Sequence, residues 1–143
     1  MLYLKRKIDA FLSEWKANPD KKPLIVKGPR QVGKTESIQR FAAENYTSVI
    51  TINFVEEPKY KMITADGYKA ADIIKNISRI DPSKRFIEGE TLIFFDELQE
   101  FPDIATALKF FKIDGRFDVI CSGSMLGLNY RKIESNSVGY KTD

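Results

Sequence analysis

The sequence predicts an α/β fold in which an open, mostly parallel sheet carries helices on both faces. Apolar stretches alternate with amphipathic ones in the order strand, helix, strand, helix, strand, helix, strand, which is typical of parallel sheets. The stretch 91–97, TLIFFDE, is apolar without alternation, as expected of a strand buried on both faces. A glycine-containing turn follows the first strand and leads directly into a helix. These three observations define the fold class.

The elements follow from local patterns. An amphipathic helix opens the chain, because apolar residues recur there at spacings of three and four. NPDKKP ends this helix, so we assign 1–22 to a helix and linker that pack on a main domain at 23–143. The predicted strands, rich in apolar and β-branched residues, are 23–28, 48–54, 91–97 and 117–124. The predicted helices of the main domain are 34–45, 69–80 and 102–111.

Composition excludes several kinds of chemistry. The chain of 143 residues has no histidine and one cysteine, Cys121, so it can form neither an internal disulfide nor a metal site of cysteines and histidines. The net charge of +3 leaves nucleic acid open as a partner but does not support it. No apolar run reaches the ~18 residues of a membrane span, and the N-terminal stretch lacks a signal-peptide core. We therefore expect a cytoplasmic protein without a membrane partner.

Residues 28–35, GPRQVGKT, match the phosphate-binding pattern G-x-x-x-x-G-K-[ST] between a strand and a helix. The glycines allow successive backbone N–H groups to face phosphate oxygens, and the helix adds its positive end. Lys34 is expected to reach the β- and γ-phosphates without packing in the core, and the Thr35 hydroxyl to bind Mg²⁺. The predicted nucleotide-binding residues are Gly28, Pro29, Arg30, Gln31, Val32, Gly33, Lys34, Thr35 and Glu36.

Two carboxylates, Asp96 and Glu97, end the apolar strand 91–97. A neighbouring parallel strand would deliver both to the edge of the sheet that holds the phosphates. Asp96 is expected to bind Mg²⁺ together with Thr35, and Glu97 to orient or deprotonate the attacking water. The sequence thus predicts ATP and Mg²⁺ as cofactors, Glu97 and Lys34 as catalytic residues, and a P-loop NTPase.

The motifs GPRQVGKT, INFVEEP, FFDELQ, LKFF and ICSGS, in this order, resemble the ATPase domain of a prokaryotic AAA+-like family. Its members join this domain to a C-terminal domain of unknown function that is often described as nuclease-like. The resemblance implies the five-stranded, additional-strand type of P-loop fold. In this fold the strand 117–124 lies between the strand 23–28, which precedes the phosphate-binding turn, and the strand 91–97. It also places Ser122 and Ser124 where such ATPases carry a polar sensor of the water or γ-phosphate, without deciding between them.

The sequence departs from this family near its C-terminus. Many relatives carry an arginine after the glycine that corresponds to Gly139, whereas this chain carries Tyr140. Such an arginine can be worth roughly 10³–10⁵ in rate in P-loop enzymes. Lys141 is adjacent but lacks the planar guanidinium, and Arg131 and Arg116 are alternatives without a supporting spacing. The identity of an arginine finger stays open.

The sequence favours two functions: an ATP-hydrolysing switch or motor module, and a nucleotide-binding interaction module with little turnover. A GTPase is disfavoured because no guanine-reading N-K-x-D segment occurs. Only four strands are recognisable, so we expect a C-terminally incomplete domain that lacks the fifth strand and the lid. Residues 23–28 would then lie at an open sheet edge, and we expect self-association through that edge together with weak turnover.

Overall fold

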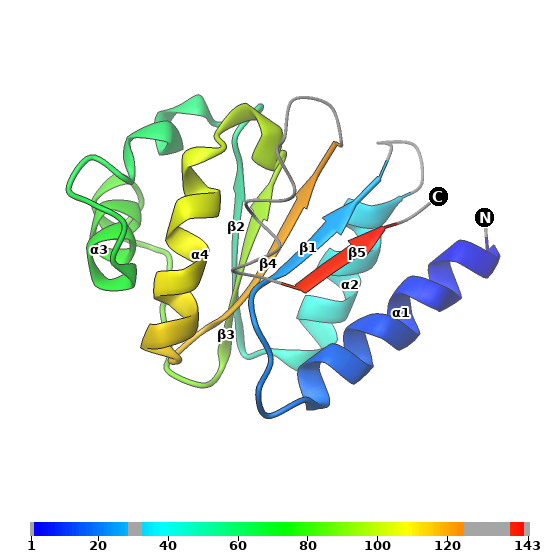
Figure 1. Cartoon of the computed structure of the whole chain (residues 1–143). Coiled ribbons are helices and arrows are strands. Elements are labelled where there is room, and N and C mark those ends of the chain that lie inside the picture. Colours follow the sequence, from blue (N-terminus) through cyan, green and yellow to red (C-terminus); the bar gives the residue numbers. More distant parts are fainter. Residues whose placement is uncertain (1, 29–32, 125–137, 142–143) are drawn as a thin grey trace.

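The computed structural model describes residues 2–28, 33–124 and 138–141. Five parallel strands form one sheet in the order β2-β3-β4-β1-β5, with helices on both faces (Figure 1). The strands are Leu24–Lys27 (β1), Ser48–Asn53 (β2), Thr91–Asp96 (β3), Asp118–Gly123 (β4) and Val138–Lys141 (β5). The helices are Leu2–Ala17 (α1), Lys34–Asn45 (α2), Ala70–Ile80 (α3) and Asp103–Asp114 (α4), with the short 3₁₀ helices Pro58–Met62 (η2) and Leu98–Glu100 (η3). The predicted fold class is confirmed.

The expected absence of a fifth strand is wrong. β5 pairs in parallel with β1, with Leu24 opposite Val138 and Lys27 opposite Lys141, so β1 has a neighbour on each side. The segment escaped prediction because it is only four residues long and contains Gly139, a residue that strands disfavour. The β1 edge is therefore covered, and the basis for self-association through it is removed.

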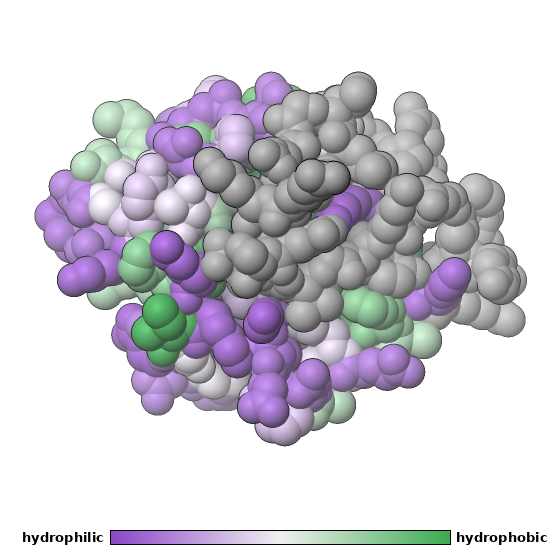
Figure 2. Space-filling model, viewed as in Figure 1, coloured by the Kyte–Doolittle hydropathy of each residue, from purple (hydrophilic) through white to green (hydrophobic). Residues whose placement is uncertain are grey.

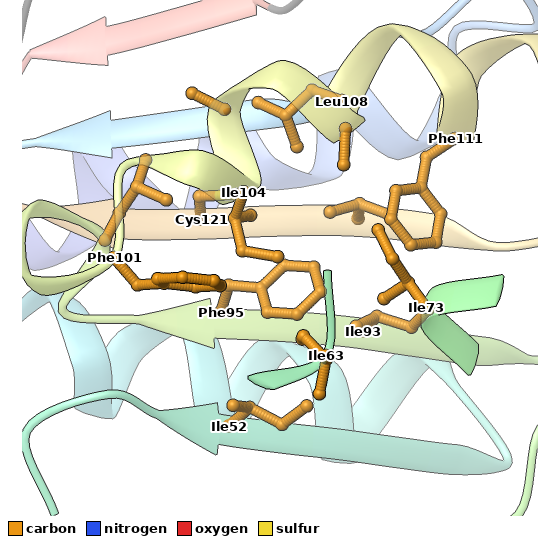
Figure 3. Close-up of a cluster of buried hydrophobic side chains, with 14 of the residues drawn as sticks. Ile52, Ile63, Ile73, Ile93, Phe95, Phe101, Ile104, Leu108, Phe111 and Cys121 are labelled. Atoms are coloured by element: carbon orange, nitrogen blue, oxygen red, sulfur yellow. The ribbon is translucent and has the colours of Figure 1, made fainter. Parts of the chain in front are cut away.

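Two hydrophobic cores lie on the two faces of the sheet. Alternation along β3 sends Phe95 to the core beneath α3 and α4, and Phe94 to the core beneath α1 and α2. Figure 3 shows Phe95 and Ile104 packed together between β3 and α4 in the first core. Cys121, fully buried in this core, takes the place of a small apolar residue. All six residues of β3 are buried, which explains why its sequence shows no polar alternation.

The N-terminal helix α1 packs on α2 and is tied to the rest of the chain by its connection to β1. Ile8, Leu12 and Trp15 are buried, and the Trp15 indole donates a hydrogen bond to the carbonyl of Lys22 at 2.7 Å. Lys112 of α4 donates to the Lys21 carbonyl at 3.1 Å, so this connection is held from both sides. The domain boundary at residue 22 stays a prediction.

On the face that Figure 2 shows, the surface of the described residues is mostly hydrophilic. Figure 2 shows green areas that are small and separate on the visible face. Among the described residues, three large hydrophobic side chains are exposed: Val55 in the turn after β2, Met62 in η2 and Ile113 in α4. Scattered apolar residues of this kind are ordinary on protein surfaces. Among the described helices, none combines the length and the apolar character that a membrane crossing needs.

Candidate functional site

The carboxyl ends of β1 and β4 meet the amino end of α2 at one edge of the sheet, and Lys34 lies where they meet. Its side chain is only 2% exposed. Its Nζ donates hydrogen bonds to the carbonyl of Gly28 and, at 3.0 Å, to the carbonyl of Gly123. The Gly28 N–H also points at the Gly123 carbonyl, at 3.4 Å. The expectation that Lys34 has no packing role is therefore wrong, because its ammonium links the first strand to the fourth.

At Gly33, the turn into α2 has the backbone conformation that its sequence predicts. Gly33 has φ 68° and ψ 24°, in the left-handed region, where an L side chain would be strained. Its carbonyl accepts the N–H of Ser37 at 3.0 Å, which starts the helix. Glu36 lies exposed in the first turn. The predicted binding residues Pro29, Arg30, Gln31 and Val32 lie outside the described residues.

Asp96, at the end of β3, faces the first turn of α2. The Thr35 hydroxyl donates to its carboxylate, at 3.2 Å to Oδ2 and 3.3 Å to Oδ1, and the Glu97 N–H donates to Oδ1 at 2.9 Å. Asp96 is 3% exposed. Burial raises the pKa of Asp96 above its ordinary value, against the opposing effect of the Glu97 N–H and of Thr35. The two residues predicted to bind Mg²⁺ are thus in contact.

Asn53, which sequence analysis did not single out, also contacts this carboxylate. Its Nδ2 lies 3.4 Å from Asp96 Oδ2, because β2 and β3 pair with Asn53 opposite Asp96. Its Oδ1 accepts the N–H groups of Val55 and Glu56 at 2.9 Å, which fixes the amide. A polar residue at the end of a β-branched strand was the available signal, although the pairing partner could not be read from it.

Glu97 follows Asp96 in a strained backbone conformation. It is the one residue other than glycine with positive φ in the described part of the chain, at φ 61° and ψ 47°. Such a conformation costs a side-chain-bearing residue about 1–2 kcal/mol and often accompanies a functional site. The Glu97 carboxylate accepts a hydrogen bond from Gln99 Nε2 at 2.8 Å. Sequence analysis gave no role to Gln99.

The structure separates the two serines that were proposed as a sensor. Ser122 is fully buried in β4, and its Oγ has no hydrogen-bond partner among the described residues. It follows Ile120 on the face that packs against α1 and α2, and it pairs with Val26 of β1. Ser124 lies beyond the strand, where its N–H donates to Gln99 Oε1 at 2.9 Å. A buried hydroxyl without a partner is expensive, so Ser122 is the better candidate.

The candidates for an arginine finger divide by position. Arg116 precedes β4 at the amino ends of the strands, and its guanidinium donates to Asp114 at 3.0 Å. Lys34 lies at the carboxyl ends of the strands, so within this chain the two residues are remote from each other. Tyr140, in β5, pairs through its backbone with Val26 of β1. Arg131 and the side chain of Lys141 lie outside the described residues.

These residues fit a nucleotide with Mg²⁺. Thr35 and Asp96 supply oxygen ligands, and Mg²⁺ commonly takes one or two protein ligands with water and phosphates as the others. Lys34 and the N-terminus of α2 provide positive charge beside them. The unpartnered Ser122 hydroxyl shows that the site holds a polar group that the described residues leave unsatisfied. The donor set therefore matches a phosphate and metal site.

The fold and this arrangement define a P-loop NTPase of the AAA+ type. The chain belongs to the AAA_14 family, whose model, described as an AAA domain, matches residues 20–143. Membership implies nucleotide binding, namely of ATP, and the capacity for hydrolysis within the family. No curated protein sequence matches the chain.

Solved structures support the fold. The chain is similar to RuvB of Thermotoga maritima, solved as a variant (TM-score 0.60, 18% identity, 100% of this chain and 45% of that one). It is also similar to a chain of Drosophila ORC bound to DNA (TM-score 0.59, 13% identity, 98% and 91%) and to C. elegans PCH-2 (0.54, 11%, 98% and 39%). The chain thus spans less than half of the RuvB and PCH-2 chains, and at these identities the likeness shows the fold alone.

Proposed function

We propose that this chain binds ATP with Mg²⁺ at the edge formed by β1, β3, β4 and α2, and that it hydrolyses ATP as a switch or motor module. The observation that carries the proposal is the contact between the Thr35 hydroxyl and the Asp96 carboxylate, at 3.2 Å. Two oxygen ligands from separate elements meet there beside the buried ammonium of Lys34. A cytoplasmic location is part of the proposal. The nearly balanced charge of the sequence and the lack of a membrane-spanning pattern support it.

Each residue has a role that follows from its chemistry. Mg²⁺, when bound, supplies positive charge that offsets the charge of the phosphates. Lys34 would exchange carbonyl oxygens for phosphate oxygens as acceptors, and Thr35 and Asp96 would hold the metal. Glu97 would accept a hydrogen bond or proton from the attacking water. The Ser122 hydroxyl would donate a hydrogen bond to a group in the site, which would give it the partner that it lacks.

The second candidate, a nucleotide-binding interaction module with little turnover, is favoured by Tyr140. Tyr140 occupies the position at which many relatives carry arginine. In β5 its backbone lies beside Val26 of β1. Without an arginine from this chain or from another copy, the rate would fall by a large factor. Adenine is the expected base in both cases.

Titration calorimetry with ATP and Mg²⁺, together with a phosphate-release assay, tests the proposal. Glu97→Gln should bind ATP with the parent affinity and release phosphate at least ~10²-fold more slowly, since it cannot take a proton. Glu100→Gln, a change at an exposed acid in η3, is the matched control and should behave as the parent. Binding without phosphate release in the parent would favour the interaction module, and absence of binding would refute both functions.

A further inference from the structure

Gln99 in η3 connects two parts of the site that are far apart in the sequence. Its Nε2 donates to the Glu97 carboxylate at 2.8 Å, and its Oε1 accepts the backbone N–H of Ser124 at 2.9 Å. One side-chain amide therefore joins the end of β3 to the end of β4. Gln99 is half-buried, so water competes only in part for these hydrogen bonds.

The orientation of this amide is determined by its neighbours. The Ser124 N–H can only donate, so it requires the oxygen of Gln99, and the ionised Glu97 carboxylate can only accept, so it requires the NH₂ group. A flipped amide would place donor against donor and acceptor against acceptor. The glutamine thus matches both partners, whereas a glutamate would match only Ser124 and an apolar residue neither.

The peptide unit between Gly123 and Ser124 extends this connection to the phosphate lysine. Its N–H is the group that donates to Gln99, and its carbonyl accepts the ammonium of Lys34 at 3.0 Å. Glu97, Gln99, this peptide and Lys34 therefore form a continuous hydrogen-bonded series.

A fixed position for Glu97 is needed because its backbone alone does not provide one. Its left-handed conformation turns the chain between β3 and η3, and the amide of Gln99, two residues further on, contacts the carboxylate. Misplacement of a reacting group by about 1 Å can lower a rate by ~10²-fold. The carboxylate that the proposed function assigns to the attacking water is thus held by the side chain of Gln99.

We infer that Gln99 is a positioning residue for the Glu97 carboxylate, which it anchors to the end of β4 and, through the Gly123–Ser124 peptide, couples to Lys34. The inference rests on the proposed function, because it deepens the role of Glu97 in hydrolysis. Gln99 holds Glu97 in the orientation from which it acts on water, and it leaves nucleotide affinity unchanged.

Two variants separate the two hydrogen bonds of the Gln99 amide, and a third serves as their control. Gln99→Met keeps the length of the side chain and removes both hydrogen bonds. Gln99→Glu keeps an acceptor for Ser124 and replaces the donor to Glu97 by a second carboxylate. Glu100→Gln alters the next residue of η3, which is exposed, and serves as the matched control.

Kinetics test the positioning role. In Gln99→Met we expect kcat for ATP to fall by about tenfold to a hundredfold, with the Kd for ATP within about twofold of the parent. In a Glu97→Gln background the same substitution should change the residual rate by less than about twofold, because the group that it positions is already disabled. A loss of equal size in both backgrounds would indicate a structural role and overturn the inference.

Nuclear magnetic resonance of the protein without nucleotide gives a second readout that needs no turnover. Amide exchange at Ser124 should accelerate by at least about tenfold in Gln99→Met and stay near the parent rate in Gln99→Glu. The carboxyl ¹³C resonance of Glu97 should move in both variants and not in Glu100→Gln. Unchanged Ser124 exchange and Glu97 resonance in Gln99→Met would overturn the inference. Absence of phosphate release in the parent would contradict the proposed hydrolysis alone, because these resonances still decide the role of Gln99.

Discussion

Replacing Lys34 by methionine should change both the stability of the empty protein and its response to ATP. Lys34 is 2% exposed, and its ammonium donates to two backbone carbonyls. Hydrogen bonds to a charged group are worth about 1.5–3 kcal/mol each, and release of a buried charge offsets part of that loss. Methionine retains most of the apolar stem. We expect the free energy of unfolding without nucleotide to fall by about 1–3 kcal/mol.

The response to nucleotide gives a larger and more specific signal. At an ATP concentration one hundred times its Kd, binding stabilises the parent by about 2.7 kcal/mol. Loss of the charged contact to phosphate should weaken binding by roughly a hundredfold. At the same ATP concentration, the stabilisation of Lys34→Met should therefore shrink to about 0.4 kcal/mol. Almost the whole effect of the ligand would be lost.

Urea unfolding followed by circular dichroism, with and without ATP and Mg²⁺, measures both quantities. Arg40→Met is the control, because Arg40 lies on the same helix and binds Asp9 at 2.8 Å on a partly exposed surface. It should lose no more than ~1 kcal/mol and keep the full response to ATP. A Lys34→Met protein that gains 2 kcal/mol or more from ATP would refute Lys34 as a phosphate ligand. An unliganded variant as stable as the parent would refute a net contribution from its carbonyl contacts.

Three further predictions concern the same edge of the sheet. Glu97→Gly should be more stable than Glu97→Ala by about 0.5–1 kcal/mol in urea unfolding, because both lose the contact with Gln99 but only glycine relieves the left-handed strain; the opposite order would contradict that conformation. Burial raises the pKa of Asp96 above 3.8. Between pH 3.8 and the raised pKa, the native state therefore binds more protons than the unfolded chain, and the free energy of unfolding falls as pH rises through the native pKa. Asp96→Asn, measured over the same pH range with a metal chelator present, should lack this fall, and parallel profiles would exclude Asp96 as its source. Ser122→Ala should leave the empty protein as stable or up to ~1–3 kcal/mol more stable, since it removes a buried hydroxyl without a partner, while phosphate release slows; an unchanged rate would exclude the sensor role.

Local sequence patterns were enough for most of the fold. The four strands with apolar or β-branched runs, the helices between them and the glycine turn at Gly33 all lie where their residues predict them. Their ends differ by one or a few residues, as at β1, which spans Leu24–Lys27 where 23–28 was expected. Such patterns succeed because each element buries an apolar face that its own sequence encodes.

What the sequence could not reveal depends on pairing between distant segments. β5 carries little strand signal of its own, and it exists because β1 offers it a parallel partner. Asn53 and Gln99 look like ordinary polar residues until the sheet brings them to Asp96 and to Ser124. The left-handed Glu97 has no sequence signal, because glutamate rarely adopts that conformation. The candidate residues with carboxylate, hydroxyl or ammonium groups could be proposed from their type, whereas Asn53 and Gln99 stand out only through the contacts that the fold gives them.

The order of the strands has a consequence for how the protein comes into being. β1 is made early, yet both of its neighbours are late: Leu24 pairs with Ile120 on one side and with Val138 on the other. During synthesis its apolar residues must wait for partners until residues 118–141 have been made, and such long-range parallel pairing is slow to form. Lys34 cannot reach the Gly123 carbonyl before that time. A nascent chain should therefore lack the complete lysine site until β4 is in place, so nucleotide capture reports the docking of β4 rather than the start of the sheet.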